Sequence, residues 1–326
     1  MILTIDGGTT NTRLYHMDGG EILASKKLSL GIRDALCSEG KKKFFHAVSD
    51  AITELTADTL VEAVICSGMI GSENGLHNCP HIAAPVSFHE LAEAMVPVSL
   101  PHIAPYPFLF IPGVKTFSVL PESSASFSMD LLSEMDIMRG EETELAGICS
   151  KLGIHGDHTF LLPGSHMKTI RLDHDGRIAA FHTSLTGELL NAVAEHSILK
   201  ASIGQAYPEI ANPVQLRRGY AFAQEYGVSR ALFKVRILDV AVGGITEDEL
   251  FAFLLGILLY DDVSRLIREN RPVTVGGSDP FRDAFRILLT DGGICADEIP
   301  KEVSDCASAY GAWELWIYRK TLTVHI

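Results

Sequence analysis

Three segments rich in Gly, Ser and Thr follow short apolar stretches and have the residue types of phosphate-binding turns. They are Asp6–Thr12, Gly164–Lys168 and Gly276–Ser278. Glycines let backbone N–H groups approach oxygen atoms closely, and such groups bind anions in turns. Each segment alone also fits a plain structural turn. Three in one chain favour nucleotide binding, although neither GxxxxGK[ST] nor a GxGxxG after a strand occurs.

Carboxylates stand at two places where phosphoryl chemistry needs them. Asp6 ends the first apolar stretch, where it could hold Mg²⁺ directly or through water; an Asx turn that caps Gly7-Gly8 is an equally weighted alternative. Glu141 and Glu142 begin a predicted helix. Adjacent helical residues point about 100° apart, so only one of the two can face a given site. The alternative for this pair is charge that complements the helix dipole.

Strands and helices that would position these residues alternate along the chain. Apolar runs predict strands over 2–5, 12–17, 61–66, 108–111, 159–162, 167–172 and 272–275. Helical spacing and capping residues predict helices over 43–55, 87–95, 139–152, 186–199, 250–267, 279–289 and 304–318. The alternation predicts an α/β protein with mixed β-sheets flanked by helices.

The N-terminal hairpin recurs near the middle of the chain. A shift of 156 residues (164 − 8) lays Gly8 on Gly164 and Thr9 on Ser165, in the same order of strand, small-residue turn and strand. The repeat predicts two similarly built domains, 1–157 and 158–326, with a cleft between them. The small residues Ala307, Ala309, Gly311 and Ala312 predict close packing of the last helix, which would return to the first domain.

Composition narrows the classes of partner. The 326 residues carry a net charge of −14, so nucleic acids and anionic membranes are unfavourable partners. The six cysteines show no CxxC spacing and no apolar run reaches 18 residues, which predicts a cytoplasmic protein with reduced thiols. The His residues 77, 81 and 89 are expected to be solvated or at the edge of the core. The apolar stretch 250–260 favours a core helix over the interface of a homo-oligomer.

Several motifs together resemble known families. Asp6-Gly7-Gly8-Thr9-Thr10-Asn11, Pro163-Gly164-Ser165-His166 and Val275-Gly276-Gly277-Ser278 resemble the two phosphate motifs and the adenosine motif of actin-like ATPases. The motifs Ser67–Ser72, Arg139-Gly140-Glu141-Glu142-Thr143 and Thr186-Gly187-Glu188 more closely resemble those of 2-dehydro-3-deoxygalactonokinases. The resemblance covers nearly the whole chain and implies two duplicated actin-like (ribonuclease H-like) domains.

This resemblance implies that the chain phosphorylates the terminal (6-) hydroxyl of 2-dehydro-3-deoxy-D-galactonate with ATP and Mg²⁺. Glu141 is then the favoured general base with Glu142 as the alternative, although related kinases usually use Asp; Asp6 would hold Mg²⁺. ATP and its phosphates would contact Gly8, Thr9, Thr10, Asn11, Gly164, Ser165, His166, Lys168, Gly276, Gly277 and Ser278. The sugar acid would contact Gly68, Met69, Ser72, Arg139 and Glu188.

The two cations among these residues have different expected tasks. Arg139 suits the substrate carboxylate, because a guanidinium offers two parallel donors, and Lys168 suits the transferred phosphate. The reverse assignment or a surface role is the alternative. A kinase for the gluconate epimer, an actin-like ATPase that drives a partner-binding switch and a phosphatase on the same fold are the competing functions.

Overall fold

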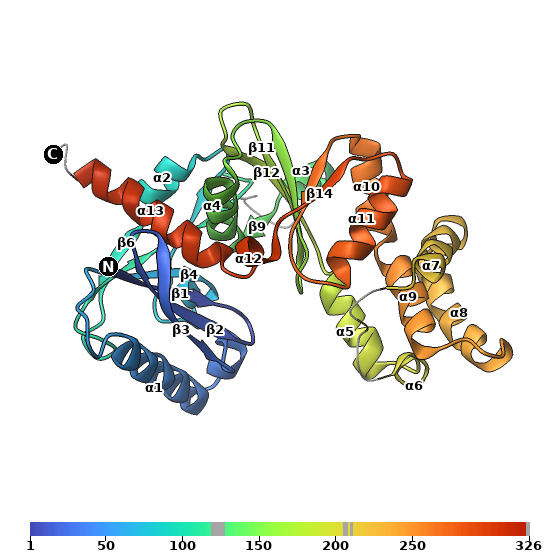
Figure 1. Ribbon diagram of the computed structural model, residues 1–326, viewed down its shortest axis with the longest axis horizontal. Helices are drawn as coiled ribbons and strands as arrows, with labels where there is room; N and C mark the ends of the chain where they lie inside the picture. The colour runs from blue at the N-terminus through green and yellow to red at the C-terminus, as the bar shows by residue number, and fades with distance from the viewer. Residues whose placement is uncertain (119–127, 205–207, 209–210, 324–326) are drawn as a thin grey trace. The chain divides into compact units, whose positions relative to one another are not determined.

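A computed structural model describes residues 1–118, 128–204, 208 and 211–323 (Figure 1). Contacts between Cα atoms divide the chain into two units. Unit 1 comprises Met1–Asp157, Leu172–Phe181 and Glu302–Ile326, and unit 2 comprises His158–Arg171 and His182–Lys301. These units differ from the expected domains 1–157 and 158–326, because residues 172–181 and the C-terminal segment group with unit 1.

Unit 1 is built on a six-stranded mixed sheet. In the order β3-β2-β1-β4-β7-β6, the strands are Glu21–Leu28, Thr12–Asp18, Ile2–Gly7, Val64–Gly68, Pro107–Phe110 and Val96–Ser99. β1 runs antiparallel to β2 and parallel to β4, in a register that sets Asp6 beside Ser67. The carboxyl ends of two parallel strands therefore meet at Asp6, the kind of edge at which α/β sheets bind ligands.

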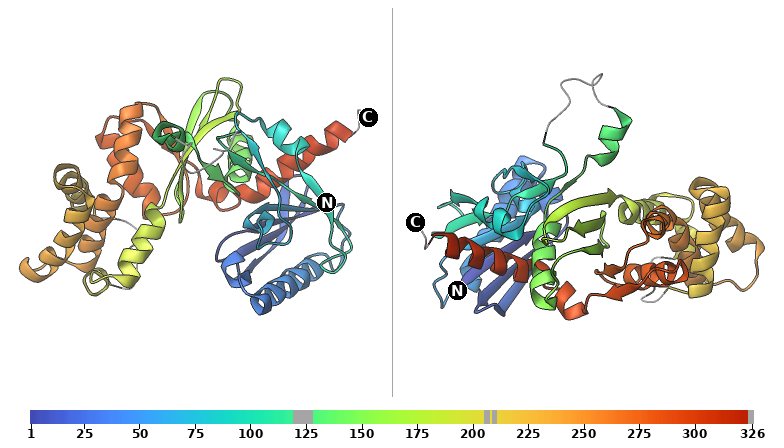
Figure 2. Two further views of the ribbon diagram at one scale, coloured as in Figure 1. Left: turned by 180° about the vertical axis from the view of Figure 1, so that it is seen from behind. Right: turned by 90° about the horizontal axis from the view of Figure 1, so that it is seen from above.

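Helices cover both faces of this sheet (Figure 2). Helix α1 (Ser38–Leu55) packs Phe44 and Val48 into a core with Leu3 and Ile5 of β1. On the other face lie α4 (Glu141–Leu152) and α13 (Ala307–Thr323), the latter also beside α2 (Phe88–Glu93). Alternation along the strand places Asp6 on the face of α4 and α13.

Helices α4 and α13 approach each other through glycine. A Cβ on Gly147 would overlap the carbonyl oxygen of Ala307, and a Cβ on Gly311 would overlap that of Thr143. The close packing predicted from the small residues of the last helix is thus confirmed. It fixes the first turn of α13, which holds Ser308, against the helix that holds Glu141 and Glu142.

A small sheet completes unit 1. It has the order β5-β8-β9, with β5 at His81–Ala83, β8 at Gly113–Lys115 and β9 at Ile137–Met138. A short helix, α3 (Met129–Glu134), precedes β9. Because β9 leads directly into Arg139-Gly140 and α4, this sheet sets the position of both Arg139 and the paired glutamates.

Unit 2 repeats the strand order of the first sheet. Its order β12-β11-β10-β13-β14 matches β3-β2-β1-β4-β7, and β10 and β13 are parallel, as are β13 and β14. The strands are Ile178–Ser184, Met167–Leu172, His158–Leu162, Val273–Val275 and Ala296–Glu298. The outer part of the β11–β12 hairpin groups with unit 1. The shared order confirms the duplication predicted from the repeated hairpin.

The helices of unit 2 enclose a large apolar core. They are α5 (Thr186–His196), α6 (Lys200–Ile203), α7 (Pro213–Tyr226), α8 (Val228–Ala241), α9 (Glu247–Leu258), α10 (Tyr260–Glu269) and α11 (Phe281–Asp291). The single helix predicted over 250–267 is wrong: α9 ends at Leu258 and α10 begins at Tyr260. The pair Asp261 and Asp262 in the first turn of α10 favours a new helix start there. The apolar α9 is buried, as its core assignment predicted.

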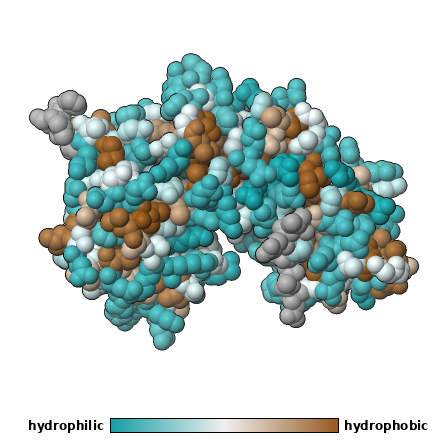
Figure 3. Space-filling view, in the orientation of Figure 1, coloured by the Kyte–Doolittle hydropathy of each residue, from teal (hydrophilic) through white to brown (hydrophobic). Residues whose placement is uncertain are grey.

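The last short helix, α12 (Lys301–Ser304), lies between β14 and α13. None of the six cysteines forms a disulfide. Within the described residues, no helix combines the length and apolarity needed to span a bilayer. Hydrophobic and hydrophilic residues are interspersed on the face shown in Figure 3.

Candidate functional site

Asp6 is held at the end of β1 by one hydroxyl and one cation. Its Oδ2 accepts a hydrogen bond from Ser308 Oγ at 3.2 Å and lies 3.7 Å from Arg13 Nη1. Burial raises the pKa of Asp6, while Arg13 and Ser308 partly oppose that rise. The side chain still exposes 19% of its surface, so the carboxylate remains reachable from solvent.

The turn after Asp6 is fixed by its backbone. The Gly8 N–H donates to the Asn11 carbonyl at 2.9 Å, and the carbonyls of Gly8 and Thr9 accept from the N–H groups of residues 32 and 33 at 3.1 and 3.0 Å. Thr9 and Thr10 remain exposed. A rigid turn with exposed hydroxyls beside a carboxylate has the chemistry of a phosphate-binding loop.

Glu142 does not extend toward solvent. Its side chain is fully buried, and both carboxylate oxygens lie 2.8 Å from the Gly140 nitrogen, which donates to them. Burial and the neighbouring Glu141 raise the pKa of Glu142 to about 7. The Glu142 side chain therefore folds back and binds the backbone N–H of Gly140, the residue that precedes its own helix.

Glu141 differs from its neighbour in exposure. It is half-buried, and its Oε2 accepts a hydrogen bond from the Arg139 N–H at 3.2 Å. The two side chains thus occupy different surroundings, in keeping with their separation around the helix. Of the pair, Glu141 is the more accessible to a ligand; its role as base stays a prediction.

Glu144 lies near the carboxylates of Asp6, Glu141 and Glu142, and the sequence interpretation missed it. Burial and the charges of Asp6 and Glu141 raise the pKa of Glu144 to about 8. The i, i+3 spacing of Glu141 and Glu144 was the available signal, since such residues share a helix face. Only the fold brings that face to Asp6.

These carboxylates fit a magnesium ion bound together with a phosphate. Mg²⁺ prefers hard oxygen ligands and commonly takes only one or two carboxylates, the remainder being water and phosphate oxygens. Asp6 supplies one reachable carboxylate. Across the described residues, the one group of three or more His, Cys, Asp or Glu side chains close enough to chelate an ion by themselves is Asp173, His174 and Asp175.

Arg139 is directed into unit 1. Its Nη2 donates to the Cys79 carbonyl at 2.6 Å and lies 3.2 Å from His81 Nδ1, whereas Nη1 is buried with no hydrogen-bond partner. Within the described ranges, Arg139 forms no ion pair. Burial, together with Arg139 and Lys115, lowers the pKa of His81 to about 4, so this imidazole is neutral near pH 7. Arg139 as a whole is half-buried, and its unpaired Nη1 is a donor whose desolvation a hydrogen-bonding partner would offset.

The loop at the end of β4 adjoins Arg139. Gly68 begins a 3₁₀ turn over Met69–Gly71, and Ser72 Oγ donates to the Met69 carbonyl at 2.7 Å. A Cβ on Gly71 would lie 3.2 Å from Arg139 Nη1. The structure therefore brings together the predicted substrate residues of unit 1, which are Gly68, Met69, Ser72 and Arg139.

In unit 2 the second predicted phosphate turn rests on the start of α5. The Glu188 N–H donates to the Ser165 carbonyl at 2.9 Å, and His166 Nε2 lies 3.5 Å from Glu188 Oε2. A Cβ on Gly187 would overlap the Gly164 carbonyl oxygen. The motif Thr186-Gly187-Glu188 thus directly supports the turn Gly164–His166.

The third glycine-rich segment lies beside the same turn. The Gly276 N–H donates to the Leu161 carbonyl at 2.8 Å, and a Cβ on Gly277, whose φ is 75°, would lie 3.0 Å from the Pro163 carbonyl oxygen. Ser278 follows directly. The turn Gly164–His166, the motif Thr186-Gly187-Glu188 and the segment Gly276–Ser278 are therefore neighbours in unit 2.

Two polar side chains in unit 2 qualify the sequence interpretation. Lys168 is only 4% exposed, and its Nζ donates to Thr183 Oγ1 at 2.6 Å, so its ammonium lies within the sheet. Asp262, which the sequence interpretation did not single out, accepts hydrogen bonds from Ser184 and Thr186 at 2.8 and 2.6 Å. Asp262 thereby anchors the start of α5.

Comparison with known proteins places the chain in context. The sequence model of the family described as 2-keto-3-deoxy-galactonokinase matches residues 6–314. A curated protein of Rhizobium meliloti (strain 1021), named as a probable 2-dehydro-3-deoxygalactonokinase DgoK1, is 30% identical over 205 residues, 62% of this chain. That match spans 59% of the relative's length, less than two thirds.

Solved structures share the fold. A protein of Sinorhizobium meliloti assigned as a 2-dehydro-3-deoxygalactonokinase superposes with a TM-score of 0.78 at 23% identity, over 97% of this chain and 98% of that one. The activator of the 2-hydroxyisocaproyl-CoA dehydratase of Clostridium difficile, with bound ADPNP, superposes with a TM-score of 0.50 at 13% identity, over 100% and 97%. The predicted α/β fold with mixed sheets flanked by helices is confirmed.

Proposed function

Because this chain belongs to the 2-keto-3-deoxy-galactonokinase family, we propose that it is an ATP-dependent kinase that phosphorylates the 6-hydroxyl of 2-dehydro-3-deoxy-D-galactonate. The product is the 6-phosphate. The observation that carries this proposal is the family match over residues 6–314. The three glycine-rich turns support it, because phosphoryl transfer relies on positioning and charge neutralisation more than on covalent chemistry.

Glu141 is the proposed general base. Its carboxylate is half-buried, whereas that of Glu142 is fully buried, so a substrate hydroxyl can approach Glu141 more readily. In this role it takes the proton of the 6-hydroxyl as that oxygen attacks the γ-phosphorus of ATP. Glu142 instead fixes the turn Arg139-Gly140 through its hydrogen bonds to Gly140.

Arg139 is the proposed partner of the substrate carboxylate. Its orphan Nη1 and its lack of an ion pair in the described part of the chain leave one charge for an anion to neutralise. The Cys79 carbonyl and the neutral His81 hold Nη2. Gly68, Met69 and Ser72 would line the rest of this subsite, and Glu188 would accept sugar hydroxyls.

ATP is the proposed phosphoryl donor, and its phosphates would contact the turns Gly8–Asn11 and Gly164–His166. Gly276, Gly277 and Ser278 would contact the nucleoside. Mg²⁺, when bound, would neutralise charge on the phosphates, and Asp6 is the residue that would hold it. Lys168 is the proposed cation for the transferred phosphate. In this role its ammonium leaves Thr183 Oγ1 and binds a phosphate oxygen when the nucleotide binds.

Product analysis tests this function. After incubation with MgATP and 2-dehydro-3-deoxy-D-galactonate, ³¹P NMR should show a new phosphomonoester signal split into a triplet by the two protons on C6. A doublet would place the phosphate on a secondary carbon. Inorganic phosphate without a sugar ester would support the ATPase or phosphatase alternative. Either result would overturn the proposed reaction.

A further inference from the structure

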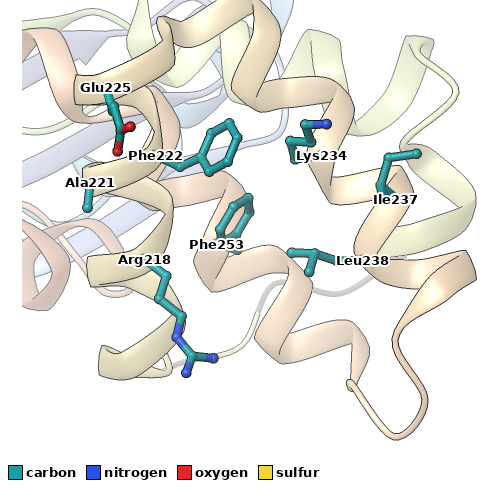
Figure 4. Close-up of a pocket in the computed structure, with 8 residues that line it drawn as sticks. All are labelled: Arg218, Ala221, Phe222, Glu225, Lys234, Ile237, Leu238 and Phe253. Atoms are coloured by element: carbon teal, nitrogen blue, oxygen red, sulfur yellow. The ribbon is translucent and has the colours of Figure 1, made fainter.

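Helices α7, α8 and α9 of unit 2 surround a surface groove of about 400 Å³ (Figure 4). Its floor is aromatic: the rings of Phe222 and Phe253 lie with their centroids 6.4 Å apart. Ile237 and Leu238 of α8 line one wall. The groove has space for a large apolar side chain.

An exposed apolar stripe on α8 adjoins this groove. Phe233, Ile237 and Val240 follow the spacing i, i+4, i+7 and expose 54%, 39% and 61% of their surfaces. The same helix buries only Ala231 and Val235. Exposed apolar residues that are contiguous along one helix face commonly mark an interaction site.

The stripe and the groove form one self-complementary surface. Ile237 belongs to both, so the protruding ring of Phe233 lies one helical turn from the groove. A two-fold interface requires this arrangement, because the same patch must supply both the projecting and the receiving parts. An aromatic side chain in an apolar pocket is also the usual energetic centre of an interface.

The charged residues around the groove also allow pairing between two copies of the surface. Arg218 and Lys234 line it together with Glu225, so the patch carries both signs although the whole chain carries −14. In a symmetric pair Glu225 of each copy can face one of the two cations of the second copy. A strongly anionic partner would pair with the two cations but would leave Glu225 opposed.

We propose that this α7–α8 surface joins two copies of the chain in a two-fold dimer, with Phe233 of each copy inserted into the groove of the other. The dimer is independent of the proposed kinase reaction, because the surface lies entirely on helices that carry none of the proposed catalytic residues.

Sedimentation equilibrium of the full chain at about 1–100 μM tests the dimer. The parent protein should approach twice 35.5 kDa, whereas Phe233→Asp should remain a monomer at the same concentrations. Leu60→Asp is the matched control, because Leu60 is an 84% exposed apolar residue of unit 1 and gains the same charge. It should dimerise like the parent, and circular dichroism should show all three chains folded.

Three results would overturn the proposal: a parent protein that stays monomeric at about 100 μM, a folded Phe233→Asp variant that still dimerises, or equal loss of the dimer in Leu60→Asp. If Phe233→Asp does not fold, charge exchange replaces it. Glu225→Lys and Lys234→Glu should each raise the dimer dissociation constant, and the double variant should lower it again. A double variant no tighter than the single ones would contradict the proposed pairing.

Discussion

Glu141 and Glu142 are adjacent, but their surroundings give them different tasks. Glu142 binds the Gly140 N–H through both oxygens and is fully buried, whereas Glu141 is partly exposed beside Arg139. A base must reach the hydroxyl proton, and a buried carboxylate that already accepts hydrogen bonds is poorly placed for that. The sequence predicted that one of the pair acts; the contacts of Glu142 support the choice of Glu141.

We expect Glu141→Gln to lower kcat by about 10²–10⁴-fold, the usual contribution of general base catalysis. Because the substitution is isosteric and the site is partly exposed, the melting temperature should change little. Glu142→Gln should instead lower stability by about 1–3 kcal/mol, since its amide places an unpaired donor in a buried position. Steady-state kinetics and thermal unfolding of both variants separate these effects. Unchanged kcat in both would refute a base at either position.

The raised pKa of Glu142 predicts a pH dependence of stability. The folded chain keeps this proton up to pH about 7, whereas the unfolded chain releases it near the ordinary 4.5. The group therefore favours folding below the lower pKa, and that contribution is lost as pH rises through the higher one. Between pH 5 and 8 the parent should lose about 2–3 kcal/mol more stability than Glu142→Gln. Urea unfolding at the two pH values measures the difference, and parallel losses would contradict the assignment.

Arg139 leads to a prediction about substrate affinity. Arg139→Gln should raise the KM for the sugar acid at least tenfold, because a charge-assisted bond is worth about 1.5–3 kcal/mol. The KM for ATP should change little. His81→Asn should shift the sugar-acid KM in the same direction by a smaller factor, since it loosens the guanidinium without removing its charge. Equal changes in both KM values would indicate a general structural effect instead.

At the scale of elements, the site of unit 1 depends on the contact between α4 and α13. Gly147 and Gly311 let the two backbones approach until a Cβ on either would overlap the other helix. That approach sets Ser308 within 3.2 Å of Asp6. The C-terminal helix, far from Asp6 in the sequence, thus helps to orient the first phosphate-site carboxylate.

Gly311→Ala should therefore push α13 away from α4. We expect a stability loss of about 1–3 kcal/mol from overpacking, together with a lower kcat as Ser308 moves away from Asp6. Gly243→Ala is the control, because a Cβ there meets open space and its φ is not positive. Thermal unfolding and kinetics of both variants test this. A Gly311→Ala protein as stable and active as Gly243→Ala would show that the contact is dispensable.

Elements with strong local signals were predictable. The paired hairpins follow from alternating strands and small-residue turns, and α2 and α9 begin at capping boxes visible in the sequence. Helices α7 and α8 were missed. The apolar residues of α8 lie on more than one side of the helix, and Phe233 and Ile237 are exposed. The sequence of α8 therefore lacks the single apolar face that predicts an amphipathic helix.

At the scale of the whole chain, the sequence predicted the site residues that stand in motifs, but it did not predict the side chains that contact them. Asp6 and the paired glutamates stand in recognisable motifs. Ser308, His81 and Asp262 act through side chains brought close by tertiary packing, and no local spacing reports such contacts. The same reason explains Lys168: its motif predicts a phosphate ligand, whereas the sheet pairs it with Thr183.

The net charge of −14 was first an argument against polyanionic partners. In the structure, cations sit at particular places within this acidic chain, with Arg13 beside Asp6 and Arg139 beside His81. A small anion can be bound by such local charges even though the overall field repels it. The proposed sugar acid and MgATP fit this requirement better than a nucleic acid does.

The most direct test of the kinase assignment is the rate of ADP release from MgATP, measured with and without 2-dehydro-3-deoxy-D-galactonate. We expect turnover that requires this sugar acid, saturates with it and is lost in Glu141→Gln. The gluconate epimer, assayed in parallel, reports the stereochemical preference. ADP release at the same rate without any sugar acid, or no release with either epimer, would contradict the kinase assignment.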